Sequence, residues 1–284
     1  NAGVALRPDP RVFHDDAWPG QINQDGPPDE GFARAPRWLR PARHARASKM
    51  VKFRALETVG SALGMAPVTP PVAVSFEPGI NAAGIAQPGC TLCGDCCGGC
   101  NVGAKNTVAL TYLPDAVRHG TEVFTELRVS HLSKRPDGAW LVSAERLDAA
   151  AGTAGGGLTL EAPMVILAAG TLGSTEILLR SREKGLALSD RLGQRFSANG
   201  DIIAFGYGAK LPVNAIGVGH PAKIAGAEIG ASVTAQIDVE DASDLANEMH
   251  IQEGALPSSL APVLPVMFVP NGRLLGALSA LVNG

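Results

Sequence analysis

Five cysteines within eleven residues are the most reactive feature of this sequence. They are the five thiols of the run CTLCGDCCGGC, namely Cys90, Cys93, Cys96, Cys97 and Cys100. The spacing C-x2-C-x2-C-x3-C is that of a bacterial ferredoxin run, whose thiolates hold an iron–sulfur cluster. The glycines in the run allow a short loop to direct several thiolates at one centre. The pattern therefore predicts an iron–sulfur cluster as a cofactor, with metal ligands at Cys90, Cys93, Cys96 and Cys100.

Three alternatives to the iron–sulfur cluster stay open. Zinc also suits closely spaced thiolates. Disulfides require an oxidising compartment, but an odd number of cysteines and the adjacent pair Cys96 and Cys97 argue against them. The third alternative is a Gly-rich loop without ligands. Asn101 stands where a ferredoxin run has proline, and the fourth cysteine of such a run serves a second cluster, which leaves the role of Cys100 open. Clustered thiols indicate a reducing, cytoplasmic setting.

The run VILAAGTLGS, residues 165–174, is the second feature with a chemical meaning. It predicts a buried strand that ends at Ala169-Gly170 and turns into a helix. A glycine at such a turn lets the backbone approach a dinucleotide closely, and a helix N-terminus favours phosphate. The alternative is that Gly170 serves only the packing of the strand on the helix.

Composition and charge exclude several classes of protein. The formal net charge is −3 and the pI is about 6.1, so no basic field indicates nucleic acid or an anionic membrane. Hydrophobic residues make up 45% and charged residues 18%, which is typical of a globular protein. The most apolar stretch, 256–269, is interrupted by prolines and suits the wall of an apolar cavity, and no transmembrane segment is expected.

The elements that position these features follow from the spacing of apolar residues. Residues 1–46 have little periodicity and are expected to run as an extended excursion over a surface. The sequence predicts helices over 47–63, 107–118 and 174–182, and strands over 122–126, 128–133, 139–147, 158–160, 163–168, 232–237 and 249–252. The strands 128–133, 139–147 and 158–160 form a meander, and 163–168 is a fully buried strand.

Four segments, in order, resemble the GMC (glucose–methanol–choline) oxidoreductase family and its cholesterol-oxidase-like bacterial branch. They are NAGVALRPDPRVF at 1–13, GAKNTVALTYLPDA at 103–116, VILAAGTLGSTEILLRS at 165–181 and LGQRFSANGD at 192–201. A fifth segment, HIQEGALPSSLAP at 250–262, resembles a strand of the substrate domain and its following proline turn. Some GMC dehydrogenases carry an iron–sulfur cluster just upstream of their GAK-like segment, with a spacing similar to that of Cys90, Cys96 and Cys100.

The resemblance implies an α/β fold made of a partial Rossmann-type FAD-binding domain, three-layered and with a β-meander, and part of an α+β substrate domain. The expected organisation has five parts. These are a flavin-proximal excursion (1–30), helices and a strand of the substrate domain or cap (31–88), the Cys-rich loop (89–103), the second half of the FAD-binding domain (104–200) and an incomplete substrate-domain sheet (201–284).

The family's cofactor contacts map onto nine residues of this sequence. Asn1, Gly3 and Val4 match the end of a Gly-rich flavin loop, and Val129 matches the strand residue whose backbone binds the adenine edge. Ala169 and Gly170 match the turn beside the ribose and pyrophosphate. Asn199, Gly200 and Asp201 match a loop that approaches the flavin. For each of them the alternative is an ordinary turn or strand residue.

The function implied by the resemblance is oxidation of an alcohol CH–OH group by hydride transfer to FAD. The family's opening GxGxxG motif and closing catalytic histidine have no match here, so we expect an internal fragment that is inactive by itself and assign no catalytic residue.

The apolar stretch 256–269 favours a sterol or another bulky apolar alcohol. Ala261 stands where sterol oxidases place an acidic base for isomerisation, and Glu253 lies in another register. The electron acceptor is oxygen or a redox protein. The rival interpretations are an iron–sulfur or metal-binding electron-transfer module and an inert fragment.

Overall fold

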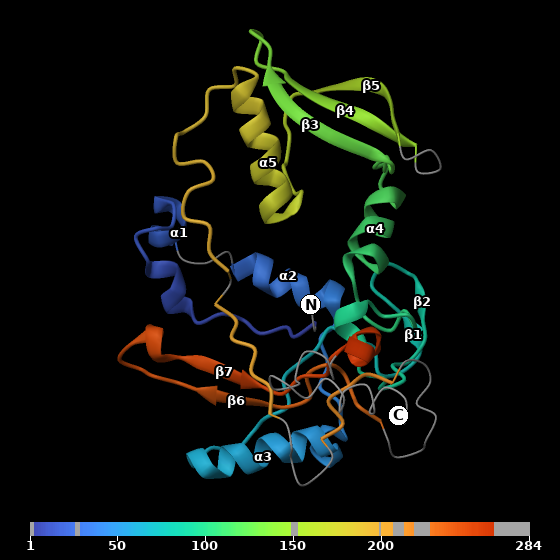
Figure 1. Cartoon of the computed structure of the whole chain (residues 1–284), viewed down its shortest axis with the longest axis vertical. Coiled ribbons are helices and arrows are strands. Elements are labelled where there is room, and N and C mark those ends of the chain that lie inside the picture. The colour runs from blue at the N-terminus through green and yellow to red at the C-terminus, as the bar shows by residue number, and fades with distance from the viewer. Residues whose placement is uncertain are drawn as a thin grey trace, which may run out of the picture. The chain divides into compact units, whose positions relative to one another are not determined.

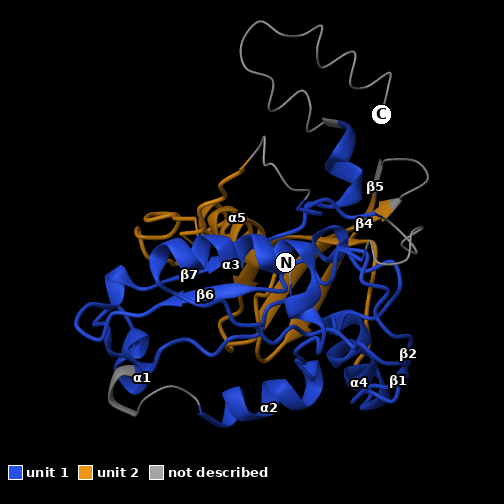
Figure 2. Cartoon of the chain, turned by 90° about the horizontal axis from the view of Figure 1, so that it is seen from below, with its two compact units in different colours: residues 1–120, 207–284 blue, residues 121–206 orange. Residues whose placement is uncertain are grey.

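The computed structural model describes residues 3–25, 29–148, 153–198, 200–206, 213–218 and 228–263 of the 284-residue chain. The chain divides into two compact units (Figure 2). Unit 1 comprises residues 1–120 and 207–284, and unit 2 comprises residues 121–206. Unit 2 overlaps the region 104–200 that we assigned to the FAD-binding part. None of the described helices is long and apolar enough to cross a membrane.

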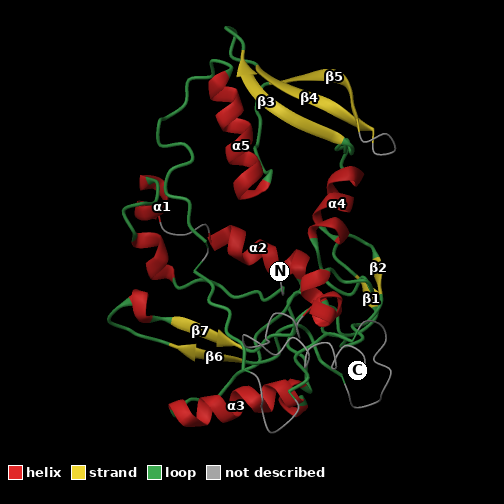
Figure 3. Ribbon diagram, viewed as in Figure 1, coloured by secondary structure: helices red, strands yellow, loops and turns green. Residues whose placement is uncertain are grey.

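Unit 1 consists of short helices, two small antiparallel sheets and long connecting segments (Figure 3). Its helices are α1 (Gly20–Asp25), α2 (Asp29–Leu39), α3 (Val51–Leu63) and α4 (Tyr112–Arg118). Its 3-10 turns are η1 (Pro10–His14), η2 (Ala47–Lys49), η3 (Cys96–Gly98), η4 (Val108–Leu110), η5 (Leu245–Asn247) and η6 (Ser258–Val263). Strand β1 (Gly79–Ile80) pairs with β2 (Ala86–Gln87), and β6 (Gln236–Val239) pairs with β7 (Met249–Gln252).

The predicted helices of unit 1 are present, and each is preceded by a 3-10 turn. The segment 47–63 divides at Met50, whose backbone is extended, and 107–118 divides at Thr111. The expectation that 1–46 lacks regular structure was wrong, since it holds α1 and α2. None of the residues of α2 is fully buried, but Phe32 and Trp38 are half-buried and contact the rings of Phe13 and Tyr112.

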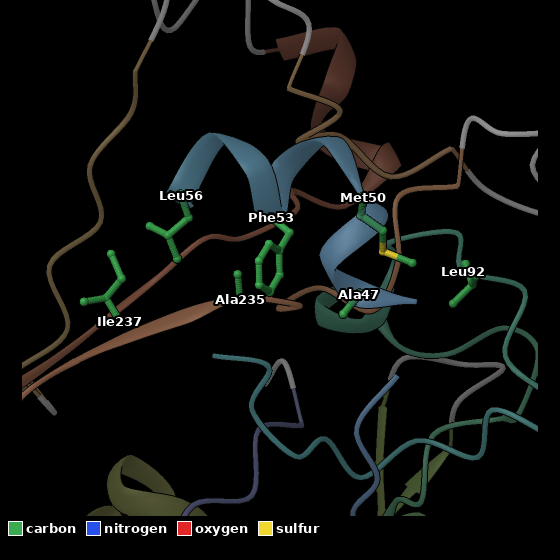
Figure 4. Packing of buried hydrophobic residues seen from close by; sticks show 7 residues of the cluster. All are labelled: Ala47, Met50, Phe53, Leu56, Leu92, Ala235 and Ile237. Carbon is green, nitrogen blue, oxygen red and sulfur yellow. The ribbon is translucent and has the colours of Figure 1, made fainter. Parts of the chain in front are cut away.

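The core of unit 1 lies between α3 and the segment that contains β6. Met50, Phe53 and Leu56 face this segment, as the spacing of apolar residues predicted, and pack with Ala235 and Ile237 (Figure 4). The cluster is completed by Ala47 and Leu92. Helix α3 ends at Gly64, whose φ of 69° belongs to the left-handed region that glycine adopts without strain. The strand expected over 232–237 begins only at Gln236.

Unit 2 is a three-stranded antiparallel sheet with one helix beside it (Figure 1). The strands are β3 (Leu127–Lys134), β4 (Trp140–Asp148) and β5 (Thr153–Ala162), and helix α5 (Gly170–Glu183) packs on β3. The predicted meander is therefore confirmed. All pairings between named strands are antiparallel among the described residues, so a parallel Rossmann-type sheet is not confirmed.

Two strand predictions in unit 2 were wrong. The segment 163–168 is not a buried strand, because it runs without strand pairing to the described residues and leaves Ile166 80% exposed. Residues 122–126 are also exposed and irregular. Strand β3 begins only after Glu126, whose φ of 57° interrupts an extended backbone. Alternation and apolarity predict a strand correctly only where a neighbouring strand receives its backbone hydrogen bonds.

A buried serine fixes helix α5 to the sheet. The Ser181 hydroxyl is fully buried, donates to the carbonyl of Ile177 at 2.7 Å and accepts from the backbone N–H of Leu132 at 2.8 Å. The guanidinium of Arg180 adds a hydrogen bond to the carbonyl of Ser130, at 3.3 Å. Because both contacts reach β3, they set the position of α5 and of the turn before it.

Replacing Ser181 with alanine tests this attachment. The substitution leaves the buried N–H of Leu132 without its acceptor, so we expect a loss of about 1–3 kcal/mol in the free energy of unfolding, measured by urea denaturation. Ser189→Ala is the matched control. The Ser189 hydroxyl accepts from the N–H of Arg191 in an exposed turn, where water replaces it. Equal stability of the two variants would contradict the assigned role of Ser181.

Candidate functional site

The turn into helix α5 has the backbone geometry that a dinucleotide site needs. Gly170 is exposed, has φ of +74°, and has open space where a side chain would begin. No side chain caps the helix at Ala169, whose own N–H donates to the Ser174 hydroxyl at 3.0 Å. A ligand can therefore approach the backbone at Gly170 closely, and the N–H groups of the first helical turn favour a phosphate.

A depression of about 570 Å³ lies beside this turn within unit 2. Its walls are the side of α5 from Thr171 to Leu179 and the segment 193–197. Leu172 and Phe196 contribute apolar surface, while Glu176 and Arg195 bring opposite charges to the rim. The depression is open, since Leu172 and Phe196 in its wall are 73% and 70% exposed.

The other predicted cofactor residues fall in both units. Val129 is half-buried in β3, paired with Ala144 next to a bulge. Gly200, with φ of +81°, and Asp201 are exposed in unit 2. Asn199 lies outside the described residues.

The predicted flavin-loop residues Gly3 and Val4 belong to unit 1. Val4 forms an antiparallel bridge with Val72, and the carbonyl of Gly3 accepts from the N–H of Ala73 at 2.7 Å. Asn1 lies outside the described residues. The left-handed φ of Gly3, +83°, matches the expected glycine turn, but these contacts by themselves are those of a packed chain segment.

The cysteine loop is attached to unit 1 by backbone and side-chain contacts. The carbonyl of Leu92 accepts from Ile229 and Gly230, at 2.9 and 3.0 Å. The buried carboxylate of Asp95 accepts from the N–H of Ser258 at 2.6 Å and from its hydroxyl at 3.1 Å. The loop is therefore held in place by segments more than 130 residues further along the chain.

Three of the predicted ligands share one apolar cluster. Cys96 is buried there, and Cys90 and Cys100 pack against it. The cluster also contains Val72, Val74, Ala104 and Ala231. Cys93 is buried as well, whereas Cys97 is exposed and its thiol lies 3.4 Å from the Ser232 hydroxyl.

The surroundings of the sulfurs favour thiols. Burial raises the pKa of Cys90 from 9.0 to about 11, and burial also raises the pKa of Cys96. Backbone N–H groups of Leu92 and Ser232 oppose the rise at Cys90 and Cys96, respectively, but do not outweigh it.

The described residues do not support the predicted metal site. Within the part of the chain that the structure describes, which includes all five cysteines, no three His, Cys, Asp or Glu side chains are arranged to hold a metal ion. The iron–sulfur cluster predicted at Cys90, Cys93, Cys96 and Cys100 is therefore not supported. The short spacing did bring three of the thiols into one apolar cluster.

A buried ion pair lies next to the cysteine loop, and sequence reasoning missed it. The Lys52 ammonium is 1% exposed and lies 2.9 Å from the Glu253 carboxylate. It also donates to the carbonyls of Ala231 and Ser232 at 2.6 and 2.7 Å. Burial lowers the pKa of Lys52, and the charge of Glu253 opposes this. A lysine within an amphipathic helix gives no signal in the sequence that it will be buried.

Glu253 is held through one oxygen by hydrogen bonds and through the other by the ion pair alone. Its Oε1 accepts from the N–H and the hydroxyl of Thr234 and from the N–H of Ala235, and its Oε2 faces the Lys52 ammonium. The carboxylate is 10% exposed. It therefore serves the structure, and its charge compensates a buried cation.

Comparison with known proteins assigns the class. Residues 75–198 match the family model described as GMC oxidoreductase, and this confirms the resemblance seen in the sequence. The matched segment includes the cysteine loop, the meander, the Gly170 turn and α5. Over this segment the chain is similar to GMC oxidoreductases.

The individual relatives are bacterial. The chain is 36% identical over 134 residues to proteins named cholesterol oxidase from two strains of Mycobacterium tuberculosis, CDC 1551 / Oshkosh and H37Rv. It is 30% identical over 144 residues to a cholesterol oxidase of Acinetobacter baumannii. The matches cover 45% of this chain, but only 22% and 24% of the Mycobacterium and Acinetobacter proteins, respectively.

The Lys52–Glu253 pair is tested by Glu253→Gln. Glutamine keeps an oxygen for the Thr234 and Ala235 donors but removes the charge, leaving the buried ammonium uncompensated. We expect a loss of about 3–5 kcal/mol in the free energy of unfolding, measured by urea denaturation.

Two further variants complete this test. Glu240→Gln removes an exposed charge from the same region and should change stability by less than about 0.5 kcal/mol. The double variant Lys52→Met, Glu253→Gln should recover much of the loss, since the buried charge is then gone. A single variant as stable as the Glu240 control would show that the pair is not needed.

Proposed function

We propose that the intact protein is an FAD-dependent oxidoreductase that oxidises the CH–OH group of an alcohol. The family match over 75–198 supports the class. The observation in the structure that carries the proposal is the open, uncapped turn at Gly170 beside the depression on α5. GMC oxidoreductases bind FAD, and an exposed glycine turn before a helix suits the sugar and pyrophosphate of a dinucleotide.

The roles of the individual residues follow from this proposal. Unit 2 is the second part of a Rossmann-type FAD-binding domain, with the backbone of Val129 at the adenine edge and Ala169 and Gly170 beside the ribose and pyrophosphate. Gly200 and Asp201 approach the flavin, as do Gly3 and Val4 of unit 1. Asn1 and Asn199, outside the described residues, complete the proposed set.

The proposed substrate is a bulky apolar alcohol of the sterol type. The relatives' name, cholesterol oxidase, supports this class. A bound flavin would supply the hydride acceptor, and oxygen or a redox protein would then take the electrons. Because the Glu253 carboxylate is engaged with Lys52 and three donors, it supplies no free base, and the proposed reaction is oxidation without isomerisation.

Gly170→Ala in the full-length protein tests the cofactor site. The added methyl group stands where the dinucleotide must approach the backbone, so we expect FAD affinity to fall about tenfold or more, corresponding to roughly 1.4 kcal/mol. The measurement is a titration of apoprotein with FAD, followed by flavin fluorescence.

Gly138→Ala is the matched control. Gly138 also has a positive φ, +92°, and open space around it, but it lies in the turn between β3 and β4. Both variants pay a similar backbone strain. Equal FAD affinities for the two variants would remove Gly170 from the cofactor site. Full-length protein that binds no FAD and oxidises no alcohol would overturn the proposed function itself.

A second candidate is an electron-transfer module that holds an iron–sulfur cluster at the cysteine loop. One observation favours it: backbone N–H groups point at the sulfurs of Cys90 and Cys96, as they do around sulfur-ligated clusters. Anaerobically purified protein would then contain iron and acid-labile sulfide, which Cys96→Ser would remove and Cys97→Ser would retain. Zinc in place of iron, or no metal, would reject this candidate.

A further inference from the structure

Positive charge is concentrated in one segment of unit 1. Residues 34–54, called the basic segment below, contain eight of the chain's 24 lysines and arginines and none of its 27 acidic residues. The segment comprises the second half of α2, the turn η2 and the beginning of α3 (Figure 1). The remainder of the chain is correspondingly acidic, so the net charge of −3 conceals a strong local separation of charge.

Most cations of the basic segment are exposed and have no carboxylate beside them. Lys52 is the buried one and pairs with Glu253, and the exposed Arg34 lies 3.5 Å from the carboxylate of Glu30. Among the described residues, six further exposed cations of the segment form no ion pair, namely Arg37, Arg40, Arg43, Arg46, Lys49 and Arg54. Clustered like charges repel one another, so the arrangement is unfavourable until a partner supplies the opposite charge.

Two of these guanidinium groups are held in a defined orientation. Arg40 Nη1 donates to the carbonyl of Ile80 at 2.7 Å, and Arg43 Nε donates to the carbonyl of Thr69 at 2.8 Å. A carbonyl carries no net charge, so both arginines keep their positive charge available to a partner. Because these groups are already oriented, binding a partner loses less side-chain entropy than it would with free side chains.

The composition of the basic segment indicates a compact acidic protein as the partner. Five of the six unpaired cations are arginines, whose planar guanidinium groups bind carboxylates through two parallel hydrogen bonds. Attachment to a membrane also needs an apolar face, but Val51 is the one exposed large apolar side chain of residues 34–54, all of which the structure describes. Nucleic acid is an extended polyanion, which the acidic remainder of the chain would repel.

We propose that the basic segment docks an acidic redox protein, which accepts the electrons of the proposed alcohol oxidation. Oxidation of one CH–OH group to a carbonyl releases two electrons and two protons, so two molecules of a one-electron acceptor are reduced and the protons pass to solvent. Oxygen, the other acceptor considered for this reaction, needs no charged docking surface. Redox complexes have small interfaces, and their association is steered by charge.

The inference rests on the proposed function for the role of the partner, and on the separation of charge for the docking surface. Steady-state kinetics of the full-length protein test it, with a sterol in detergent as the alcohol and acidic cytochrome b5 as the acceptor. We expect kcat/KM for cytochrome b5 to fall about tenfold or more when salt rises from about 10 mM to about 0.5 M, because salt screens the attraction. Basic cytochrome c should show no such fall. No reduction of cytochrome b5, or the same salt dependence for both cytochromes, would overturn the proposal.

Charge reversal tests the position of the docking surface. The double variant Arg46→Glu, Lys49→Glu should lower kcat/KM for cytochrome b5 at low salt about tenfold, since such charges act mainly on the association rate. Lys184→Glu with Arg191→Glu is the matched control, because both residues are exposed in unit 2 and the net charge changes equally. If the two double variants behave alike, the basic segment is not the docking surface.

A small artificial acceptor separates this inference from the proposed function. Dichlorophenolindophenol needs no docking surface, so alcohol oxidation with this dye should be equally fast in the unaltered protein and in both double variants. Activity with the dye but none with cytochrome b5 would overturn the docking inference and keep the flavoenzyme proposal. Salt-dependent binding of cytochrome b5 by full-length protein that oxidises no alcohol would overturn the proposed function and keep the docking surface.

Discussion

One buried ammonium group joins the parts of unit 1 on which the cysteine loop depends. Lys52 projects from α3 and ties that helix to the carbonyls of Ala231 and Ser232 and to the carboxylate of Glu253. A charge at 1% exposure is tolerated only where each of its hydrogens has an acceptor. The segment that holds Ala231 and Ser232 also donates backbone hydrogen bonds to the carbonyl of Leu92 in the cysteine loop. Leu92 packs in the apolar core of α3 as well, so polar and apolar contacts fix the same end of the loop.

In unit 2 a single buried hydroxyl group attaches a helix to the sheet. The Ser181 hydroxyl links α5 to the backbone of β3, and the helix then presents the Gly170 turn and the depression beside it. The same unit leaves the outer face of 163–168 uncovered. The unit therefore combines a firmly attached helix with an exposed apolar segment.

Much of the fold was predictable where apolar periodicity coincided with a local partner. The meander formed because each strand pairs with the next along the chain, and the helix at 51–63 formed because its apolar stripe meets β6. The strand expected at 163–168 is absent because no described strand pairs with this segment, and a hydrogen-bond ladder cannot be inferred from one strand. In the candidate site, Gly170 was predictable from the strand–glycine–helix pattern, whereas Lys52 and Ser181 gave no signal because long-range contacts define their roles.

The sequence by itself determined the resemblance to GMC oxidoreductases, the clustering of the thiols and the glycine turn before α5. These features depend on residues that are close together in the sequence, so their local geometry can be predicted from it. Only the tertiary structure decided that Cys90 and Cys96 are held as buried thiols of raised pKa, and that Glu253 is held by Lys52. Side-chain direction and burial depend on segments far apart in the chain, and no spacing rule contains that information.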